Sequence, residues 1–315
     1  MSHAAPRRLT LLAAFAAIYL FWGATFLAVR YAVLVVPPML IIFFRCAGGA
    51  LILFGWLAWR RELERTTWPQ WRTAAIAGLL LFLGCHVALA WAEQRMSSGQ
   101  AALFSSTIPL WIVLIEAAKA RAIPIARVLL GMALGIVGVG VLAGGTALNA
   151  GLASDRALVA IGAFCWAAGS LVGRHGARPH GATQSTAMQL ASGALWVFAA
   201  SALHGDLAHF SAARLDLRAD LALLFLVLCG TVLAFGSYTW LLRVASPAAV
   251  SSYAFVNPMV ALALGVAVGD DALSGRIVLS TALVIAAVAL TRGSTPLFGS
   301  PGTTYGSIFF FNTPK

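Results

Sequence analysis

The polar side chains best placed to bind a solute surround two prolines in the middle of apolar stretches. Ser105 and Thr107 come shortly before Pro109, and Asn257 comes directly before Pro258. A proline inside a helix removes one amide donor and frees the carbonyl four residues earlier. Such a turn can hold the polar part of a solute and can bend. We therefore predict binding by these three polar residues and hinges at the two prolines. Plain kinks that fit neighbouring helices are the alternative.

Aromatic and ionisable side chains lie at similar depth. Trp22 and Trp166 occur midway along apolar stretches, whereas tryptophan is usually enriched at the membrane interface. Their rigid faces suit the wall of a cavity for apolar or amphipathic solutes, although core packing explains them equally well. His86 can exchange a proton, bond a substrate carboxylate or, as a neutral imidazole, bond a backbone carbonyl. Thr25 and Tyr253 complete the predicted solute-binding set.

Two charged residues fall within apolar stretches. Arg45 lies about seven residues into one stretch, and Glu116 lies near the end of another. Both are expected to reach the interface or to pair, rather than to take part in transport. No acidic residue occupies the middle of any stretch, which argues against a carrier that moves protons or sodium ions on a carboxylate.

Patterns typical of enzymes and of metal sites are missing from the sequence. It contains no HExxH, GxSxG or Walker motif, and its histidines have no metal-ligand spacing. The four cysteines lie within apolar stretches without metal or redox spacing and are expected to be small apolar fillers. We therefore predict no catalytic residues, no metal and no cofactor.

The composition indicates a chain built for a lipid bilayer, with 61% hydrophobic and only 10% charged residues. Each apolar stretch approaches the ~20 residues that a helix needs to cross a bilayer. Continuous hydrophobicity favours helices over barrel strands, which are shorter and alternate in polarity. We predict ten transmembrane helices, the first a retained span rather than a signal peptide, at residues 9–29, 38–59, 73–92, 98–118, 124–145, 157–174, 184–204, 219–242, 247–268 and 276–291.

The second half of the sequence repeats features of the first. Trp22 and Arg30 recur 144 residues later as Trp166 and Arg174, and Trp91 and Pro109 recur 149 residues later. We predict repeats at residues 1–148 and 149–292, followed by a mobile tail at 293–315. Five spans are an odd number, so the second repeat enters the membrane inverted. Fourteen of the 21 Lys and Arg residues fall on the side of the N-terminus, which predicts that both termini are cytoplasmic. The span with Gly131, Gly135 and Gly138 is expected to pack closely.

Several of these motifs together resemble those of the EamA-type carriers of the drug/metabolite transporter superfamily. The matching residues are Trp22-Gly23-Ala24-Thr25-Phe26, Pro38 with Phe43-Phe44-Arg45, Ala101–Ser106 with Pro109-Leu110, and Ser246-Pro247-Ala248 with Asn257-Pro258. The resemblance implies ten helices in two inverted repeats around a central cavity. It also implies movement of small metabolites across the bacterial inner membrane, with similarity to exporters of amino acids, including aromatic ones. The second half lacks the glycine directly after Trp166, so the repeats are unequal.

We therefore predict an all-α integral membrane protein that exports small metabolites, most of all amino acids, by alternating access around a midplane cavity. The expected partners are a small-molecule substrate and the lipid bilayer. Nucleic acid is not expected, because the charges behind the net +11 lie in short loops between the spans. A lipophilic-cation efflux carrier and a membrane scaffold without transport activity are the alternatives. The oligomeric state has no signal in the sequence.

Overall fold

The computed structural model describes residues 8–121, 123–143, 152–211, 215–245, 250, 253–268 and 273–291. Every element described in these ranges is a helix. The predicted repeat boundary after residue 148, the tail at 293–315 and the motif at 246–248 lie outside the described residues.

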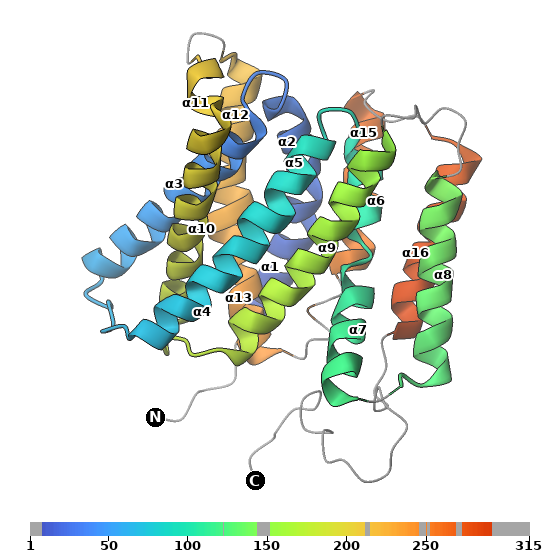
Figure 1. Cartoon of the computed structure of the whole chain (residues 1–315), viewed down its shortest axis with the longest axis horizontal. Coiled ribbons are helices and arrows are strands. Elements are labelled where there is room, and N and C mark those ends of the chain that lie inside the picture. Colours follow the sequence, from blue (N-terminus) through green and yellow to red (C-terminus); the bar gives the residue numbers. More distant parts are fainter. Residues whose placement is uncertain are drawn as a thin grey trace.

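The helices follow the apolar stretches of the sequence closely (Figure 1). In chain order they are α1 Arg8–Ala16, η1 Ala17–Phe21, α2 Trp22–Ala32, α3 Pro38–Trp59, α4 Trp68–Gly78, η2 Leu79–Val87, α5 Ala88–Ala92, α6 Ser98–Ser105, α7 Ile108–Ala120, α8 Ala126–Ala143, α9 Leu152–His175, α10 Ala182–His204, α11 Asp206–His209, α12 Leu217–Phe225, η4 Leu226–Phe235, α13 Gly236–Val244, α15 Tyr253–Val268 and α16 Gly275–Thr291. The elements η1, η2 and η4 are π-helical segments within longer helices.

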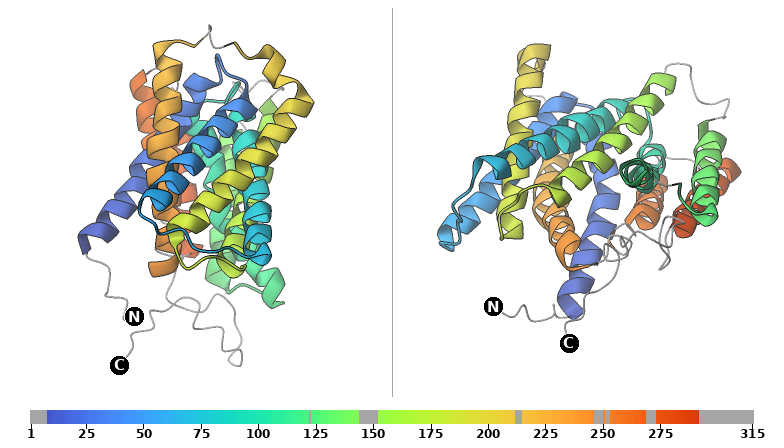
Figure 2. Two further views of the ribbon diagram at one scale, coloured as in Figure 1. Left: turned by 90° about the vertical axis from the view of Figure 1, so that its left-hand side faces the viewer. Right: turned by 60° about the horizontal axis from the view of Figure 1, so that its bottom comes forward.

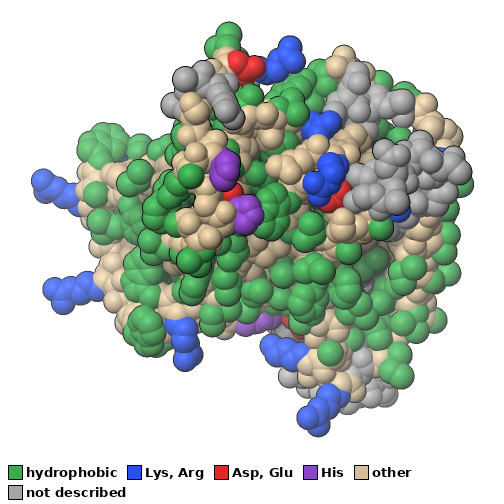
Figure 3. Space-filling view, turned by 45° about the horizontal axis from the view of Figure 1, so that its top comes forward, with side chains coloured by type: hydrophobic (Ala, Val, Ile, Leu, Met, Phe, Trp, Pro, Cys, Tyr) green, Lys and Arg blue, Asp and Glu red, His purple; other side chains and the backbone are tan. Residues whose placement is uncertain are grey.

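Within the part of the chain that the structure describes, seven helical stretches are long and apolar enough to cross a membrane. They are Arg8–Ala32, Pro38–Trp59, Trp68–Ala92, Ser98–Ala120, Ala153–His175, Ala182–His204 and Leu217–Val244. Three shorter apolar stretches, at Ala126–Gly138, Val256–Val268 and Gly275–Ala287, coincide with the other predicted spans. Large hydrophobic side chains cover much of the surface in Figure 3. The prediction of an all-helical membrane protein is confirmed, whereas ten crossings and an inverted repeat stay predictions.

The helices form a bundle in which early and late segments of the chain alternate. α3 packs along α10, η2 packs on α9, and α2 lies between α12 and α15. α1 begins and α16 ends at the same end of the bundle (Figures 1 and 2). Glycine residues lie where the helices of the bundle approach one another most closely. A Cβ on Gly78 would lie 2.8 Å from the Gln189 carbonyl oxygen, and one on Gly193 would lie 2.3 Å from the Phe82 ring.

The pair formed by α8 and α16 stands at one side of the bundle (Figure 1). Its contact face contains the small residues predicted to pack closely. A Cβ on Gly138 would lie 3.0 Å from Val284 of α16. One on Gly135 would lie 3.4 Å from Ala287 of α16 and 2.6 Å from Leu110 of α7. The Ser280 hydroxyl donates to the Gly138 carbonyl over 2.6 Å, as expected where two backbones approach closely in lipid. The predicted close packing of Gly135 and Gly138 is confirmed.

Candidate solute-binding cavity

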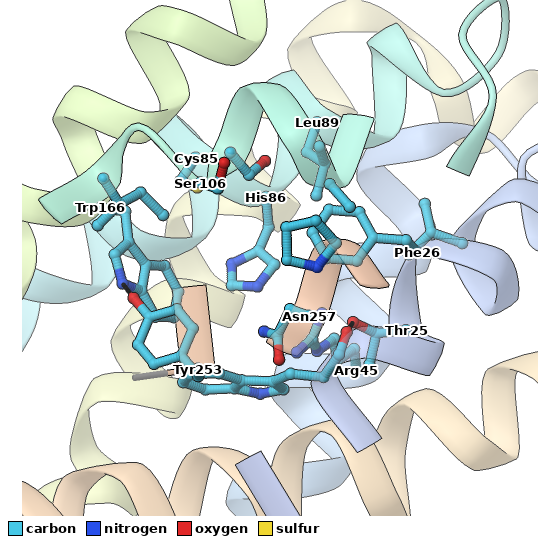
Figure 4. A pocket seen from close by; sticks show the side chains of 16 residues that line it. Thr25, Phe26, Arg45, Cys85, His86, Leu89, Ser106, Trp166, Tyr253 and Asn257 are labelled. Atoms are coloured by element: carbon cyan, nitrogen blue, oxygen red, sulfur yellow. Dashed lines mark hydrogen bonds between the residues drawn. The ribbon is translucent and has the colours of Figure 1, made fainter. Parts of the chain in front are cut away.

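Most of the predicted binding residues lie around one cavity at the centre of the bundle (Figure 4). Counting the part open to its surroundings, the empty space of the cavity is about 620 Å³. Seven of the eight predicted binding residues and one predicted hinge line it: Trp22, Thr25, His86, Ser105, Trp166, Tyr253, Asn257 and Pro258. Side chains from five predicted spans therefore meet at one place.

Thr107 is the predicted binding residue that lies elsewhere. Its hydroxyl donates to the Phe104 carbonyl over 2.9 Å. Together with Trp111 and Met132, among others, it lines a separate, strongly apolar cavity between α7, α8 and α9. Ser105 and Thr107 are only two residues apart, and the turn between α6 and α7 points them in different directions. Thr107 therefore does not face the central cavity.

The two prolines shape their helices differently. Pro109 stands at the start of α7, after a break at residues 106–107 that divides the predicted span into α6 and α7. Pro258, in contrast, lies inside the continuous helix α15. The first proline therefore marks an interruption and the second does not, so the two halves of the chain are unequal at this point.

Aromatic rings close one side of the cavity as a connected layer. The Trp22 ring packs edge-on against Trp166 at 5.4 Å and against Tyr253 at 5.2 Å between centroids. Tyr238 joins the layer 5.0 Å from Trp22, and its hydroxyl donates to Ser170 over 3.0 Å. The indole nitrogen of Trp166 donates to the Tyr253 hydroxyl over 3.2 Å. Trp22 and Trp166 are thus both core residues and cavity walls.

His86 belongs to the π-helical segment η2 and bonds a backbone carbonyl, which is one of the roles considered from the sequence. Its Nδ1 lies 2.8 Å from the Leu81 carbonyl oxygen. Because a carbonyl oxygen only accepts, this contact requires the proton on Nδ1 and leaves Nε2 as the free ring nitrogen. The ring stacks on Phe82 at 5.4 Å and meets the edge of Trp166 at 5.3 Å. His86 therefore lines the cavity in a fixed orientation.

Asn257 links α15 to the π-helical segment η1. With its amide turned to satisfy its neighbours, Nδ2 donates to the carbonyl oxygens of Ile18 and Tyr19, each over 3.1 Å, and to that of Tyr253 over 3.2 Å. A π-helical turn leaves backbone carbonyls without their usual helical donors, and the amide supplies donors for two of them. Its nitrogen therefore holds two helices together at the wall of the cavity.

Arg45 is a cavity residue that the sequence analysis did not include among the predicted binding residues. Rather than reaching the interface, its side chain is only 3% exposed and lines the central cavity. Nε donates to the Thr231 hydroxyl over 2.7 Å, and Nη2 donates to the Gly230 carbonyl oxygen over 3.2 Å. That carbonyl also accepts from Trp22 Nε1 over 3.0 Å. The general rule that charges buried in a membrane are functional was the signal that could have identified it.

A second cavity, of about 410 Å³, lies beyond the aromatic layer and is basic. Arg174, Arg178 and Arg243 line it together with Tyr238 and Gln189. Arg243 donates to backbone carbonyls of residues 179–181, and Arg178 donates to the Arg174 carbonyl. Tyr238 belongs both to this lining and to the aromatic layer. The layer therefore separates the two cavities.

Polar contacts join early and late parts of the chain at both ends of the bundle. At one end, Arg95 binds the fully buried carboxylate of Asp155 through Nε over 2.8 Å and also through Nη2. This hydrogen bond raises the pKa of Arg95. At the other end, the Glu64 carboxylate accepts from the backbone amides of His180 over 2.9 Å and Gly181 over 2.6 Å. Both connections therefore tie residues of the first half of the chain to residues of the second half.

Comparison with known proteins identifies the family. The sequence matches the EamA-like transporter family over residues 9–144 and 156–293. It is 31% identical over 293 residues to a protein named "Uncharacterized inner membrane transporter YedA" from Escherichia coli K12, covering 92% of this chain and 93% of the relative. Proteins of the same name from E. coli O6:H1 and O157:H7 match equally well.

A solved structure, described only as "Crystal structure of protein", shares the fold. It has a TM-score of 0.62 and 24% identity, and the match covers 90% of this chain and 96% of the solved one. The family match extends over most of the sequence and agrees with the long apolar helices. The chain therefore belongs to the EamA-like transporter family and is a membrane transporter.

Proposed function

We propose that this chain is a secondary transporter of the inner membrane that exports small metabolites, with amino acids as the first candidates. The observation that carries the proposal is the central cavity, where polar groups and aromatic faces from distant parts of the sequence meet. Thr25, Ser105 and Asn257 offer hydrogen-bonding groups, and Trp22 and Trp166 offer flat apolar walls. Such a lining suits a small solute with a polar head and an apolar side chain.

Alternating access around this cavity is the proposed mechanism. The aromatic layer of Trp22, Trp166, Tyr238 and Tyr253 separates the central cavity from the basic one, and therefore suits a gate. Pro109 and Pro258 are the proposed bending points, since neither can donate the backbone hydrogen bond that would stiffen its turn. Opening of one end would keep the contacts of the other end intact.

The proposed arrangement in the membrane has two inverted repeats of five helices, with both termini in the cytoplasm. The two segments that match the family, 9–144 and 156–293, support the proposed repeats. The excess of Lys and Arg on the side of the termini supports the orientation. The relatives' names support the inner membrane.

The alternatives fit the cavity less well. A lipophilic-cation efflux carrier would need a cation partner, whereas the described residues that line the cavity include Arg45 and no Asp or Glu. A scaffold without transport activity would have no need for polar and aromatic side chains around a central cavity.

Counterflow in proteoliposomes tests the proposal. Vesicles that contain wild-type protein are loaded with an amino-acid mixture, and the uptake of labelled amino acids is measured one at a time. We expect saturable exchange that is abolished in Trp22→Ala and weakened in Asn257→Ala. Trp59→Ala is the matched control, because Trp59 is 73% exposed at the end of α3. Absence of exchange with every amino acid, in folded protein, would exclude this substrate class.

A further inference from the structure

Arg45 provides a fixed positive charge in the central cavity. Its side chain is 97% buried, since only 3% of its surface is exposed, and it lines the space next to Thr25 and Asn257 (Figure 4). A guanidinium carries five N–H donors. Among the described residues, Thr231 and Gly230 accept two of them. Donors therefore remain for a ligand in the cavity.

The residues around Arg45 hold the guanidinium in place without neutralising it. The Thr231 hydroxyl donates to the Leu226 carbonyl over 2.8 Å, so its oxygen is oriented to accept from Nε. The π-helical segment η4 presents the Gly230 carbonyl to Nη2. None of the ion pairs within the described part of the chain includes Arg45. Glu93 acts on it electrostatically but does not line the cavity.

A buried cation of this kind is costly unless an anion pairs with it. Contacts to one hydroxyl and one carbonyl position a guanidinium but do not form an ion pair with it. Arginine has a planar fork that matches a carboxylate in a bidentate manner. The surrounding aromatic walls, Trp22, Phe26, Trp166 and Tyr253, suit an apolar or aromatic body attached to that carboxylate.

We propose that Arg45 binds the carboxylate of the transported solute and thereby selects anionic or zwitterionic solutes over amines. This inference rests on the proposed function and deepens it. It requires a carboxylate on the solute but no ammonium group, because no described Asp or Glu lines the cavity. The site therefore takes aromatic and apolar carboxylates with or without an amino group.

Four probes of similar size separate the two charges of an amino acid. L-phenylalanine has both charges, 3-phenylpropionate has only the carboxylate, and L-phenylalaninamide and phenethylamine have only the ammonium. Binding is measured as thermal stabilisation of the purified protein, and transport as counterflow. We expect the two carboxylates to bind and to be transported at least about tenfold more effectively than the two amines.

Variants assign this preference to Arg45. Arg45→Gln should reduce carboxylate binding about tenfold or more and abolish the preference, and Arg45→Lys should restore part of it. Thr231→Val keeps the charge but removes the acceptor of Nε, so it should weaken binding less. Arg60→Gln is the matched control, because it removes an arginine that is 52% exposed at the end of the same helix. If Arg45→Gln does not fold, Arg45→Lys and Thr231→Val decide the test.

The outcomes separate this inference from the proposed function. Equal transport of all four probes, or an unchanged preference in Arg45→Gln, overturns the inference and leaves transport intact. Carboxylate binding that depends on Arg45, without counterflow of any probe, supports the inference and overturns the proposed export. If the carboxylates neither bind to nor exchange through folded wild-type protein, both are overturned.

Discussion

Replacement of Trp22 tests whether the aromatic layer holds the centre of the bundle together. Trp22 is 6% exposed, and its ring lies between 5.0 and 5.4 Å from those of Tyr238, Tyr253 and Trp166. Trp22→Ala removes all of these contacts together with the hydrogen bond to Gly230. Trp22→Phe keeps an aromatic ring and removes the indole donor. The two variants therefore separate ring packing from hydrogen bonding.

The expected costs follow from what each variant leaves behind. A buried Trp→Ala change costs about 3–5 kcal/mol of the free energy of unfolding. Trp22→Phe should cost about 1–2 kcal/mol, because it loses one hydrogen bond and a little packing. The Gly230 carbonyl is not orphaned in either variant, since Arg45 Nη2 still donates to it. At about 2–4 °C per kcal/mol, Tm should fall by roughly 6 °C or more for alanine and by roughly 2–8 °C for phenylalanine.

Thermal unfolding of the purified protein in detergent measures both effects. Trp59→Ala, which replaces a tryptophan that is 73% exposed, should change Tm by less than about 2 °C. Counterflow on the same samples should be lost in Trp22→Ala and retained in part in Trp22→Phe. If Trp22→Ala unfolds within about 2 °C of the wild type, the aromatic layer does not stabilise the bundle and the reasoning is wrong.

Three further variants test other parts of the structure. Arg95→Ala should lower the free energy of unfolding by about 1–2 kcal/mol, because it leaves the fully buried Asp155 carboxylate without its half-exposed partner. Asp155→Asn should cost less. Chemical denaturation of both variants measures which one is less stable. Gly138→Leu should push α8 away from α16. It should lower Tm by several degrees more than Ser280→Ala, which removes only one hydrogen bond of the same contact. Equal Tm values for the two variants would contradict this. Thr107→Val should leave the counterflow KM unchanged within about twofold, because Thr107 faces another cavity. A large rise in KM would show that Thr107 contributes to the solute site.

The sequence predicts the positions of the helices well, because the bilayer imposes a length on each apolar stretch. The predicted span at 38–59 coincides with helix Pro38–Trp59, and the other predicted spans fall on helices with small shifts at their ends. Residues at similar depth on different helices tend to meet at the centre of a bundle. For this reason Trp22, His86, Trp166 and Asn257 line one cavity although up to 235 positions separate them.

Orientation around the helix axis is what the sequence does not provide. Ser105 and Thr107 have the same kind of side chain at nearly the same depth, but the turn between α6 and α7 sends Thr107 to another cavity. Arg45 was expected to reach the interface or to pair, and only the contacts with Thr231 and Gly230 on a distant helix place it in the cavity. Tyr238 was missed because a single tyrosine in an apolar stretch belongs to no repeat or motif that would indicate a cavity residue. The π-helical segments were missed for the same reason.

A structure of the protein saturated with L-phenylalanine tests the central claim most directly, namely that the cavity between Arg45 and the aromatic layer is the solute site. The account predicts ligand density in this cavity, with the carboxylate at the Arg45 guanidinium and the ring against Trp22 or Trp166. Density for the ligand at another place, or an empty cavity in a preparation that exchanges L-phenylalanine, would contradict it.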